Sequence, residues 1–280
     1  MPPTTVDVRL LDALLRASEP AAVPMLAARL NESTARIRKS LESLRASGCV
    51  LERDPVRGVR LLEAGLGVWS DYLATIGRSD SRRHVSVYQR TGSTQDVARQ
   101  LLLDLGAEVD GAVVAANEQT MGRGRLGRVW RARAGEAVLL SRVAMVAAPS
   151  RQAAVERVTL AAAVAMAKTI RAVAPDLGVE IRWPNDLYVG DRKLAGILVE
   201  VTASAGGPIG AVIGAGVNVT QRGDALADAA RSLGRPITSL IAEGAGVDRL
   251  RVAGGLVRPP DTWLAARDAR CVEAWRALSR

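Results

Sequence analysis

The sequence predicts an α+β protein in which a small helical domain precedes a larger domain of strands and helices. Early in the chain, apolar residues recur at helical spacing, as in residues 6–16. Later, short apolar runs have the length of buried strands and enclose a long stretch rich in Ala, Val and Leu, residues 153–173, which predicts a helix. The predicted strands cover residues 112–117, 138–143, 179–183, 186–189, 194–201 and 209–219.

The composition excludes several kinds of protein and of active site. His84 is the single histidine, so a two-histidine metal motif is impossible, and no metal-ligating residue is expected. Cys49 and Cys271 lie too far apart for a zinc motif or a disulfide framework, which fits a cytoplasmic protein. The first residues show no signal peptide, and the most apolar helical stretch, residues 158–167, is too short to cross a membrane.

The net charge of +9 is spread evenly, because residues 1–62, 63–220 and 221–280 each carry an excess of three basic residues. Only three of the 38 basic residues are lysines, so arginine is the common basic residue and each lysine is more informative. Two local clusters stand out from this even background. They comprise Arg36, Arg38, Lys39 and Arg45, and then Arg123, Arg125, Arg128, Arg131 and Arg133.

The first sixty residues have the pattern of a winged helix-turn-helix. Helices are predicted over residues 6–16, 25–30 and 33–46, and a strand hairpin over residues 49–53 and 58–62. The third helix has an apolar face and a basic one, and such a helix can meet phosphates and base edges in the major groove. The candidate DNA-binding residues are Ser33, Arg36, Arg38 and Lys39. The alternative is a helical module that contacts another protein.

A loop rich in glycine and arginine, residues 119–130, follows the strand predicted at 112–117. Its glycines match the spacing of a dinucleotide-binding fingerprint, but the acid expected about 20 residues later is replaced by Arg142, so that function is rejected. None of the three lysines follows a glycine, which excludes a P-loop. Glycines allow close approach of the backbone to a ligand, and guanidinium groups suit phosphates, so the loop is expected to bind an anion. Because its five arginines repel one another, the loop is expected to be mobile until an anion binds.

Three segments, in this order, carry a specific resemblance. They are Gly-Arg-Gly-Arg-Leu-Gly-Arg at 122–128 followed by Trp130, Trp-Pro-Asn-Asp at 183–186, and Arg-Lys-Leu-Ala-Gly-Ile-Leu-Val-Glu at 192–200, with Ser-Thr-Gln upstream at 93–95. Over roughly residues 5–250 the chain resembles the biotin protein ligases, and its N-terminal part is similar to that of the bifunctional ligase/repressor members. The resemblance implies a class II synthetase-like central domain with a mixed β-sheet flanked by helices.

The resemblance also implies a two-step reaction. Biotin and ATP with Mg²⁺ give biotinyl-5′-AMP, and the biotinyl group then moves to a lysine of a biotin carboxyl carrier protein domain of acetyl-CoA carboxylase. Lys193, Arg125 and Asp186 are implied as catalytic residues. Residues implied to bind biotin and the nucleotide are Ser93, Thr94, Gln95, Gln119, Gly122, Arg123, Gly124, Arg125, Arg128, Trp130, Lys193, Gly196 and Asn218.

Charge explains why such residues suit this chemistry. A carboxylate and a triphosphate repel each other, so cations must neutralise them and stabilise the charge of the transition state. The ammonium of Lys193 is a compact charge that can reach oxygens of both groups, although Lys193 could also be a surface turn residue. Asp186 could likewise be a turn-capping residue. The ureido ring of biotin is neutral, so hydroxyl and amide side chains are the expected contacts.

The resemblance leaves differences and alternatives. Arg182 and Gln95 stand where the family usually has Lys and Asn, and the chain is too short for the usual SH3-like C-terminal barrel. The expected domains are a winged helix at 1–65, a linker helix at 66–84, a catalytic domain at 85–245 and an atypical C-terminal segment at 246–280. A biotin-responsive repressor that binds operator DNA and dimerises with ligand is expected. The alternatives are a DNA-binding biotin or biotinyl-AMP sensor with little ligase activity, and a lipoate or octanoate transferase.

Overall fold

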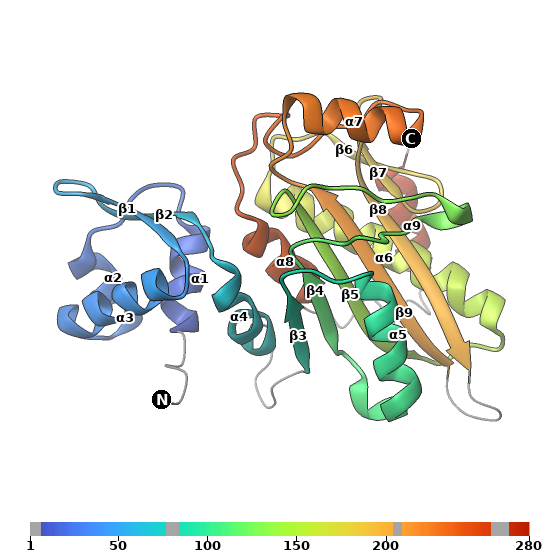
Figure 1. Ribbon diagram of the computed structural model, residues 1–280, viewed down its shortest axis with the longest axis horizontal. Helices are drawn as coiled ribbons and strands as arrows, with labels where there is room; N and C mark the ends of the chain where they lie inside the picture. Colours follow the sequence, from blue (N-terminus) through green and yellow to red (C-terminus); the bar gives the residue numbers. More distant parts are fainter. Residues whose placement is uncertain (1–6, 77–83, 204–208, 259–268, 280) are drawn as a thin grey trace. The chain divides into compact units, whose positions relative to one another are not determined.

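The chain folds into two compact units, residues 1–82 and residues 83–280 (Figure 1). The structure is a computed structural model that describes residues 7–76, 84–203, 209–258 and 269–279. Each unit has its own buried apolar core. Within the described residues, no helix combines the length and the apolar character needed to cross a membrane.

The first unit contains the helices and the hairpin predicted from the sequence. Asp7 and Ser33 begin the first and third helices, since their side chains accept hydrogen bonds from the backbone N–H groups of Leu10 and Arg36. Asn31, with a φ of 54°, ends the second helix in the left-handed conformation. The elements are α1 (Val8–Arg16), α2 (Val23–Leu30), α3 (Thr34–Ala46), β1 (Val50–Asp54), β2 (Gly58–Glu63), a short 3-10 helix (Leu66–Val68) and α4 (Trp69–Thr75).

Helix α4, which falls in the segment expected to be a linker, is part of the core of the first unit. Trp69 is 1% exposed and Leu73 is fully buried. The hydroxyl of Tyr72 donates to Asp12 of α1 at 2.8 Å. This helix therefore adds apolar surface to a three-helix unit whose own core is small.

The second unit is built on a mixed seven-stranded sheet with the strand order β3-β4-β5-β9-β8-β7-β6. β3 and β4 are parallel, and every other neighbouring pair in this sheet is antiparallel. The central partners β5 and β9 pair over ten residues each. The strands are β3 (Val85–Tyr88), β4 (Val113–Ala116), β5 (Ala137–Val146), β6 (Val179–Arg182), β7 (Asp186–Val189), β8 (Arg192–Ala203) and β9 (Ile209–Asn218).

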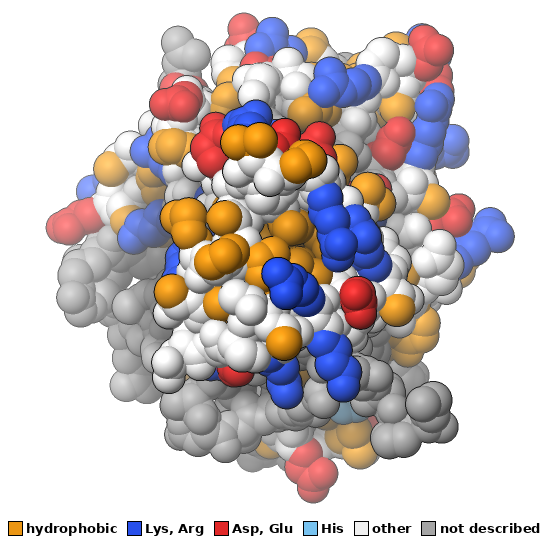
Figure 2. All heavy atoms as spheres, turned by 90° about the vertical axis from the view of Figure 1, so that its left-hand side faces the viewer, with side chains coloured by type: hydrophobic (Ala, Val, Ile, Leu, Met, Phe, Trp, Pro, Cys, Tyr) orange, Lys and Arg blue, Asp and Glu red, His pale blue; other side chains and the backbone are white. Residues whose placement is uncertain are grey.

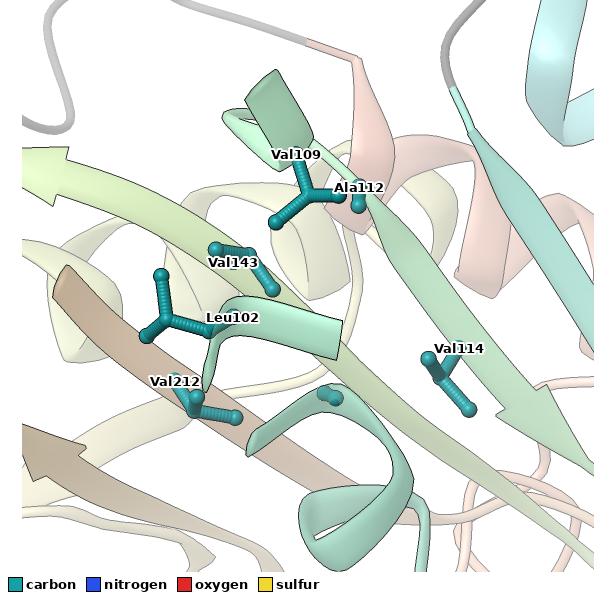
Figure 3. Packing of buried hydrophobic residues seen from close by; sticks show 7 residues of the cluster. Leu102, Val109, Ala112, Val114, Val143 and Val212 are labelled. Atoms are coloured by element: carbon teal, nitrogen blue, oxygen red, sulfur yellow. The ribbon is translucent and has the colours of Figure 1, made fainter. Parts of the chain in front are cut away.

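Helices cover both faces of this sheet (Figure 1). On one face, α5 (Thr94–Leu105) packs against β4, β5 and β9, while α6 (Arg151–Val173) and α8 (Arg249–Val257) pack against the opposite face. Figure 3 shows the core under α5, where Leu102 lies over Val143 and Val212. The sheet is thus held between helices on both of its faces.

Four helices were not expected from the sequence. α5 follows directly from Ser93, and α7 (Gly223–Leu233) follows β9. In the segment expected to be atypical, α8 and α9 (Ala269–Leu278) both pack against α6. The described part of this segment is therefore a component of the second unit.

The buried side of α5 supplies a test of this packing. Replacing Leu102, which is 6% exposed, by Ala leaves a cavity between the helix and the sheet, so we expect a loss of about 2–5 kcal/mol in the free energy of unfolding. The matched control is the neighbouring Leu103→Ala, because Leu103 is 57% exposed and its loss should change stability by about 0.5 kcal/mol or less. Urea unfolding of both variants measures this difference. Equal effects of the two substitutions would contradict the described orientation of α5.

Candidate active site

A cavity of about 350 Å³ opens over the central strands of the sheet in the second unit. Its walls come from the start of α5, the glycine–arginine loop, and the strands β5, β7, β8 and β9. Most residues that the sequence singled out for binding or catalysis line it. They are Ser93, Thr94, Gln95, Gln119, Arg123, Gly124, Arg125, Arg128, Trp130, Asp186, Lys193 and Gly196.

One wall of the cavity is a chain of uncharged polar groups. The carbonyl oxygen of the Gln119 side chain accepts from the backbone N–H and the hydroxyl of Thr94, at 2.7 and 3.0 Å. The Thr94 hydroxyl also lies 2.9 Å from the Ser141 hydroxyl, which donates to Gln95 at 3.0 Å. Gln95 in turn donates to the carbonyl of Val212. These links fix the side chains in position, which suits the recognition of a neutral polar ligand.

Two glycines of β9 leave room for larger side chains above the sheet. A Cβ at Gly214 would lie 2.6 Å from the side-chain oxygen of Gln95. A Cβ at Gly216 would lie 2.7 Å from the indole ring of Trp130. The small residues that the sequence shows in this strand are therefore required for the cavity wall to close.

The glycine–arginine loop is folded as a short hairpin. The N–H of Gly124 donates to the carbonyl of Arg128, and the N–H of Trp130 donates to the carbonyl of Gly122. Arg123 forms two hydrogen bonds with Asp96 of α5, at 2.6 and 2.8 Å, and lies 3.8 Å from Glu200. Arg123 is therefore paired with acids of other elements, and the expected mobility of the loop stays a prediction.

Arg123 and Asp96 have opposite charges at a hydrogen-bond distance. The guanidinium holds the pKa of the Asp96 carboxyl below its ordinary value of 3.8. The carboxylate therefore stays ionised, and this pair fastens the loop to α5.

Arg125 points to the next part of the site. Its guanidinium donates to the side chain of Asn185 at 3.1 Å. Asn185 is buried, and its amide donates to the carbonyl of Ile197 in β8 at 2.6 Å. The partner of Arg125 is neutral, so its positive charge is not cancelled by this contact.

Lys193 lies in strand β8, where it is 8% exposed, so it is not a surface turn residue. A bulge between β7 and β8 shifts their pairing, so that Tyr188 pairs with Lys193 while Leu187 pairs with Ala195. The ammonium of Lys193 lies 2.7 Å from the Asp186 carboxylate. A bulge of this kind redirects a side chain, and here it joins the two charged groups on the cavity side.

Burial has the largest effect on the pKa of Lys193 in this pair. Burial lowers the pKa of Lys193 below its ordinary value of 10.5, and the nearby charge of Asp186 opposes this effect. Arg235 and Arg128 add to the lowering, because they carry the same charge as the ammonium. A buried cation among other cations creates a position where an anion is favoured.

Two predicted binding residues lie outside the lining of this cavity. Gly122 is buried at the base of the loop, where a Cβ would lie 2.5 Å from the carbonyl of Trp130. Asn218 donates to the carbonyl of Thr238 and accepts from Gln221, so its side chain holds the chain segment that follows α7. Both residues support the surroundings of the site.

Several residues of the site were missed from the sequence. Ser141 is fully buried and is the hydroxyl that joins Thr94 to Gln95. Its one sequence signal is a polar residue inside an apolar strand. Asp96 was missed because it lies on a helix that was not expected, and Arg235 because it follows the motifs by some forty residues.

The Lys193–Asp186 pair can be tested through stability. Replacing Asp186 by Asn leaves a buried ammonium without its carboxylate, so we expect a loss of about 3–5 kcal/mol at pH 7 in urea unfolding. The pKa of Lys193 in the folded variant lies below 10.5, so the unfolded chain binds more protons and stability should rise with pH up to about 10.5. Asp228→Asn is the control, since that exposed carboxylate should contribute about 1 kcal/mol or less. Asp186→Asn with wild-type stability would contradict the buried pair.

The chain is similar to known proteins over most of this unit. Residues 87–218 match the model of the Biotin/lipoate A/B protein ligase family. The bifunctional ligase/repressor BirA of Bacillus spizizenii is 32% identical over 216 residues, which are 76% of this chain and 64% of that protein. The biotin–[acetyl-CoA-carboxylase] ligase of Mycobacterium tuberculosis is 36% identical over 188 residues, which are 65% of each chain.

A solved structure shows the same fold. The biotin protein ligase of Leishmania major, in complex with biotinyl-5-AMP, superposes with a TM-score of 0.53 at 22% identity, covering 70% of this chain and 81% of that one. The chain spans slightly less than two thirds of the length of the two curated relatives. The match over residues 87–218, the shared fold and the three ordered motifs around one cavity show that this part of the chain is similar to the biotin/lipoate A/B protein ligase family.

Proposed function

We propose that the protein is a biotin protein ligase that uses ATP to attach biotin to a lysine of a biotin carboxyl carrier protein. The observation that carries the proposal is the composition of the single cavity described above. One wall is uncharged and polar, from Thr94 to Gln119, and other walls supply the cations Arg125, Arg128 and Lys193. These walls suit a ligand with a neutral polar ring and a reaction that joins a carboxylate to a phosphate.

In the first step, an oxygen of the biotin carboxylate attacks the α-phosphorus of ATP and pyrophosphate leaves. Both reactants are anions, so the site must lower their repulsion. Lys193 is a cation held in the wall by Asp186, and Arg125 is a cation whose described partner is neutral. We assign these two residues to binding the oxygens of the carboxylate and of the α-phosphate, where their charges lower the repulsion. The indole ring of Trp130 packs against Gly216 and offers a flat apolar surface for the adenine.

In the second step, the amine of the carrier lysine attacks the acyl carbon of the adenylate, and AMP leaves. The incoming ammonium must lose a proton before it can attack. Asp186 is the carboxylate in the lining of the cavity, so we assign it to orienting the neutral amine, after the proton of the ammonium has passed to solvent. Lipoate and octanoate transfer are less favoured, because three relatives of this chain are named as biotin ligases.

Magnesium is included because ATP reacts as its magnesium complex. No group of three or more His, Cys, Asp and Glu side chains that could hold a metal occurs in the described part of the chain. Mg²⁺ usually keeps several waters and is bound through the phosphates of its substrate. Because Asp186 is already engaged by Lys193 and Arg235, we assign the metal to the phosphates of the nucleotide.

The role of Lys193 is testable with a matched lysine. Lys193→Ala should lower the rate of biotinyl-AMP formation by about 100-fold or more, since it removes the cation nearest the reacting oxygens. Lys168→Ala is the control, because Lys168 is exposed on α6 and lies outside the cavity lining. The assay follows adenylate formed from radiolabelled ATP and biotin. Equal rates for both variants would remove Lys193 from the reaction.

The complete reaction separates the proposal from its alternatives. Radiolabelled biotin, ATP, Mg²⁺ and a carrier domain are incubated with the protein. Label on the carrier supports the ligase, and adenylate without labelled carrier supports a sensor. Transfer of lipoate or octanoate in place of biotin would support the related transferases.

The first unit supports a second proposed function, the binding of operator DNA. Arg36, Arg38 and Lys39 are exposed on α3, and in the described residues none of them forms an ion pair. Figure 2, which faces this unit, shows Lys and Arg side chains gathered beside apolar ones. The hairpin β1–β2 follows α3, as a wing follows a recognition helix. A role as a repressor is consistent with the name of the bifunctional relative, and dimerisation with ligand stays a prediction.

DNA binding is tested by removing this charge. The triple variant Arg36→Gln, Arg38→Gln, Lys39→Gln should weaken binding to duplex DNA and make the plot of log K against log salt shallower by up to about three units. Adenylate formation should not change. The control is Arg151→Gln, Arg222→Gln, Arg231→Gln, with the same change of charge on exposed residues of the second unit. If both triple variants bind DNA equally, α3 is not the binding helix.

A further inference from the structure

Arg235 lies in the lining of the cavity, although it belongs to none of the three motifs. It is carried by the segment that follows α7. This segment is tied to the start of β8, because the N–H of Lys193 donates to the carbonyl of Pro236 and the N–H of Thr238 donates to the carbonyl of Lys193. Arg235 and Lys193 therefore stand on neighbouring backbone segments.

The guanidinium of Arg235 is held by two residues of β7. It donates to the hydroxyl of Tyr188 at 3.0 Å and lies 3.8 Å from the Asp186 carboxylate. Tyr188 is itself fixed, since it is buried and the guanidinium of Arg182 lies 4.2 Å from the centre of its ring. The Arg235 side chain is 32% exposed, so part of the group remains accessible from the cavity.

A count of charges around Asp186 leaves a positive excess. Its carboxylate faces both Lys193, at 2.7 Å, and Arg235, at 3.8 Å. One negative charge cannot neutralise two positive ones, and both cations are partly removed from water. An anion that enters the cavity would relieve this repulsion, so the cluster favours anion binding.

We propose that Arg235 is a further anion-binding residue that contacts the phosphate chain of the nucleotide and the pyrophosphate it releases. This rests on the proposed function. A triphosphate carries several negative charges, whereas the biotin carboxylate carries one, so together they need more cations than Lys193, Arg125 and Arg128 supply. The planar guanidinium matches two phosphate oxygens at once. A cation at this place would repel the ammonium of an incoming lysine, which disfavours a role in binding the carrier.

The test measures binding of inorganic pyrophosphate and of biotin to the full chain by isothermal titration calorimetry. Arg235→Gln should weaken pyrophosphate binding by about ten- to a hundredfold, the effect of losing a charge-assisted hydrogen bond, and change the affinity for biotin by less than about twofold. Arg231→Gln is the matched control, because Arg231 is exposed, lies four residues away, and is outside the cavity lining. It should bind both ligands like the wild type.

Three results would overturn the proposal. The first is a wild-type chain that binds no pyrophosphate, and the second is an Arg235→Gln variant with wild-type affinity for it. The third is an equal loss of pyrophosphate and biotin binding, because Arg235 would then support the shape of the cavity through Tyr188. Pyrophosphate binding needs no reaction, so a chain that binds it but forms no biotinyl-AMP separates failure of the proposed function from failure of this inference.

Discussion

The arrangement of the second unit follows from the burial of one ammonium group. A charge that is removed from water needs an opposite charge at short distance, and Lys193 finds it in Asp186 on the adjacent strand. The bulge in β8 is required for this meeting, because a regular strand alternates its side chains between the two faces of the sheet. The backbone irregularity and the buried ion pair are therefore one feature. It also fixes the segment after α7, whose backbone pairs with that of Lys193.

The rest of the cavity combines rigidity with space. β9 contributes glycines where Gln95 and Trp130 approach the sheet, so bulky side chains can form the walls without widening the fold. The polar wall is closed by hydrogen bonds between side chains, including the buried Ser141. The loop is fastened at Asp96. Prior ordering of this kind lowers the conformational entropy that a ligand must remove when it binds.

The sequence predicted the parts of this site that lie within short segments. Local patterns predicted where the strands lie along residues 112–219 and where the helix at 153–173 lies. The ordered motifs predicted most of the cavity lining. Contacts between distant segments could not be predicted in this way. Asp96 neutralises an arginine 27 residues away, and Arg235 meets Asp186 only because a strand and a later loop are paired. Asn218 was expected to bind the ligand because of the family resemblance, but its amide donates to the later segment and it lies outside the cavity lining.

The scarcity of lysine has a consequence for the proposed reaction. An acyl adenylate reacts with free amines, whereas a guanidinium stays protonated and does not act as an acyl acceptor under these conditions. The described cavity surrounds its contents with arginines and with one amine, Lys193, which is engaged by a carboxylate. Lys168 is exposed on α6 and is not part of the lining. A basic cavity built in this way offers positive charge while presenting few nucleophiles of its own, which protects the chain from acylating itself.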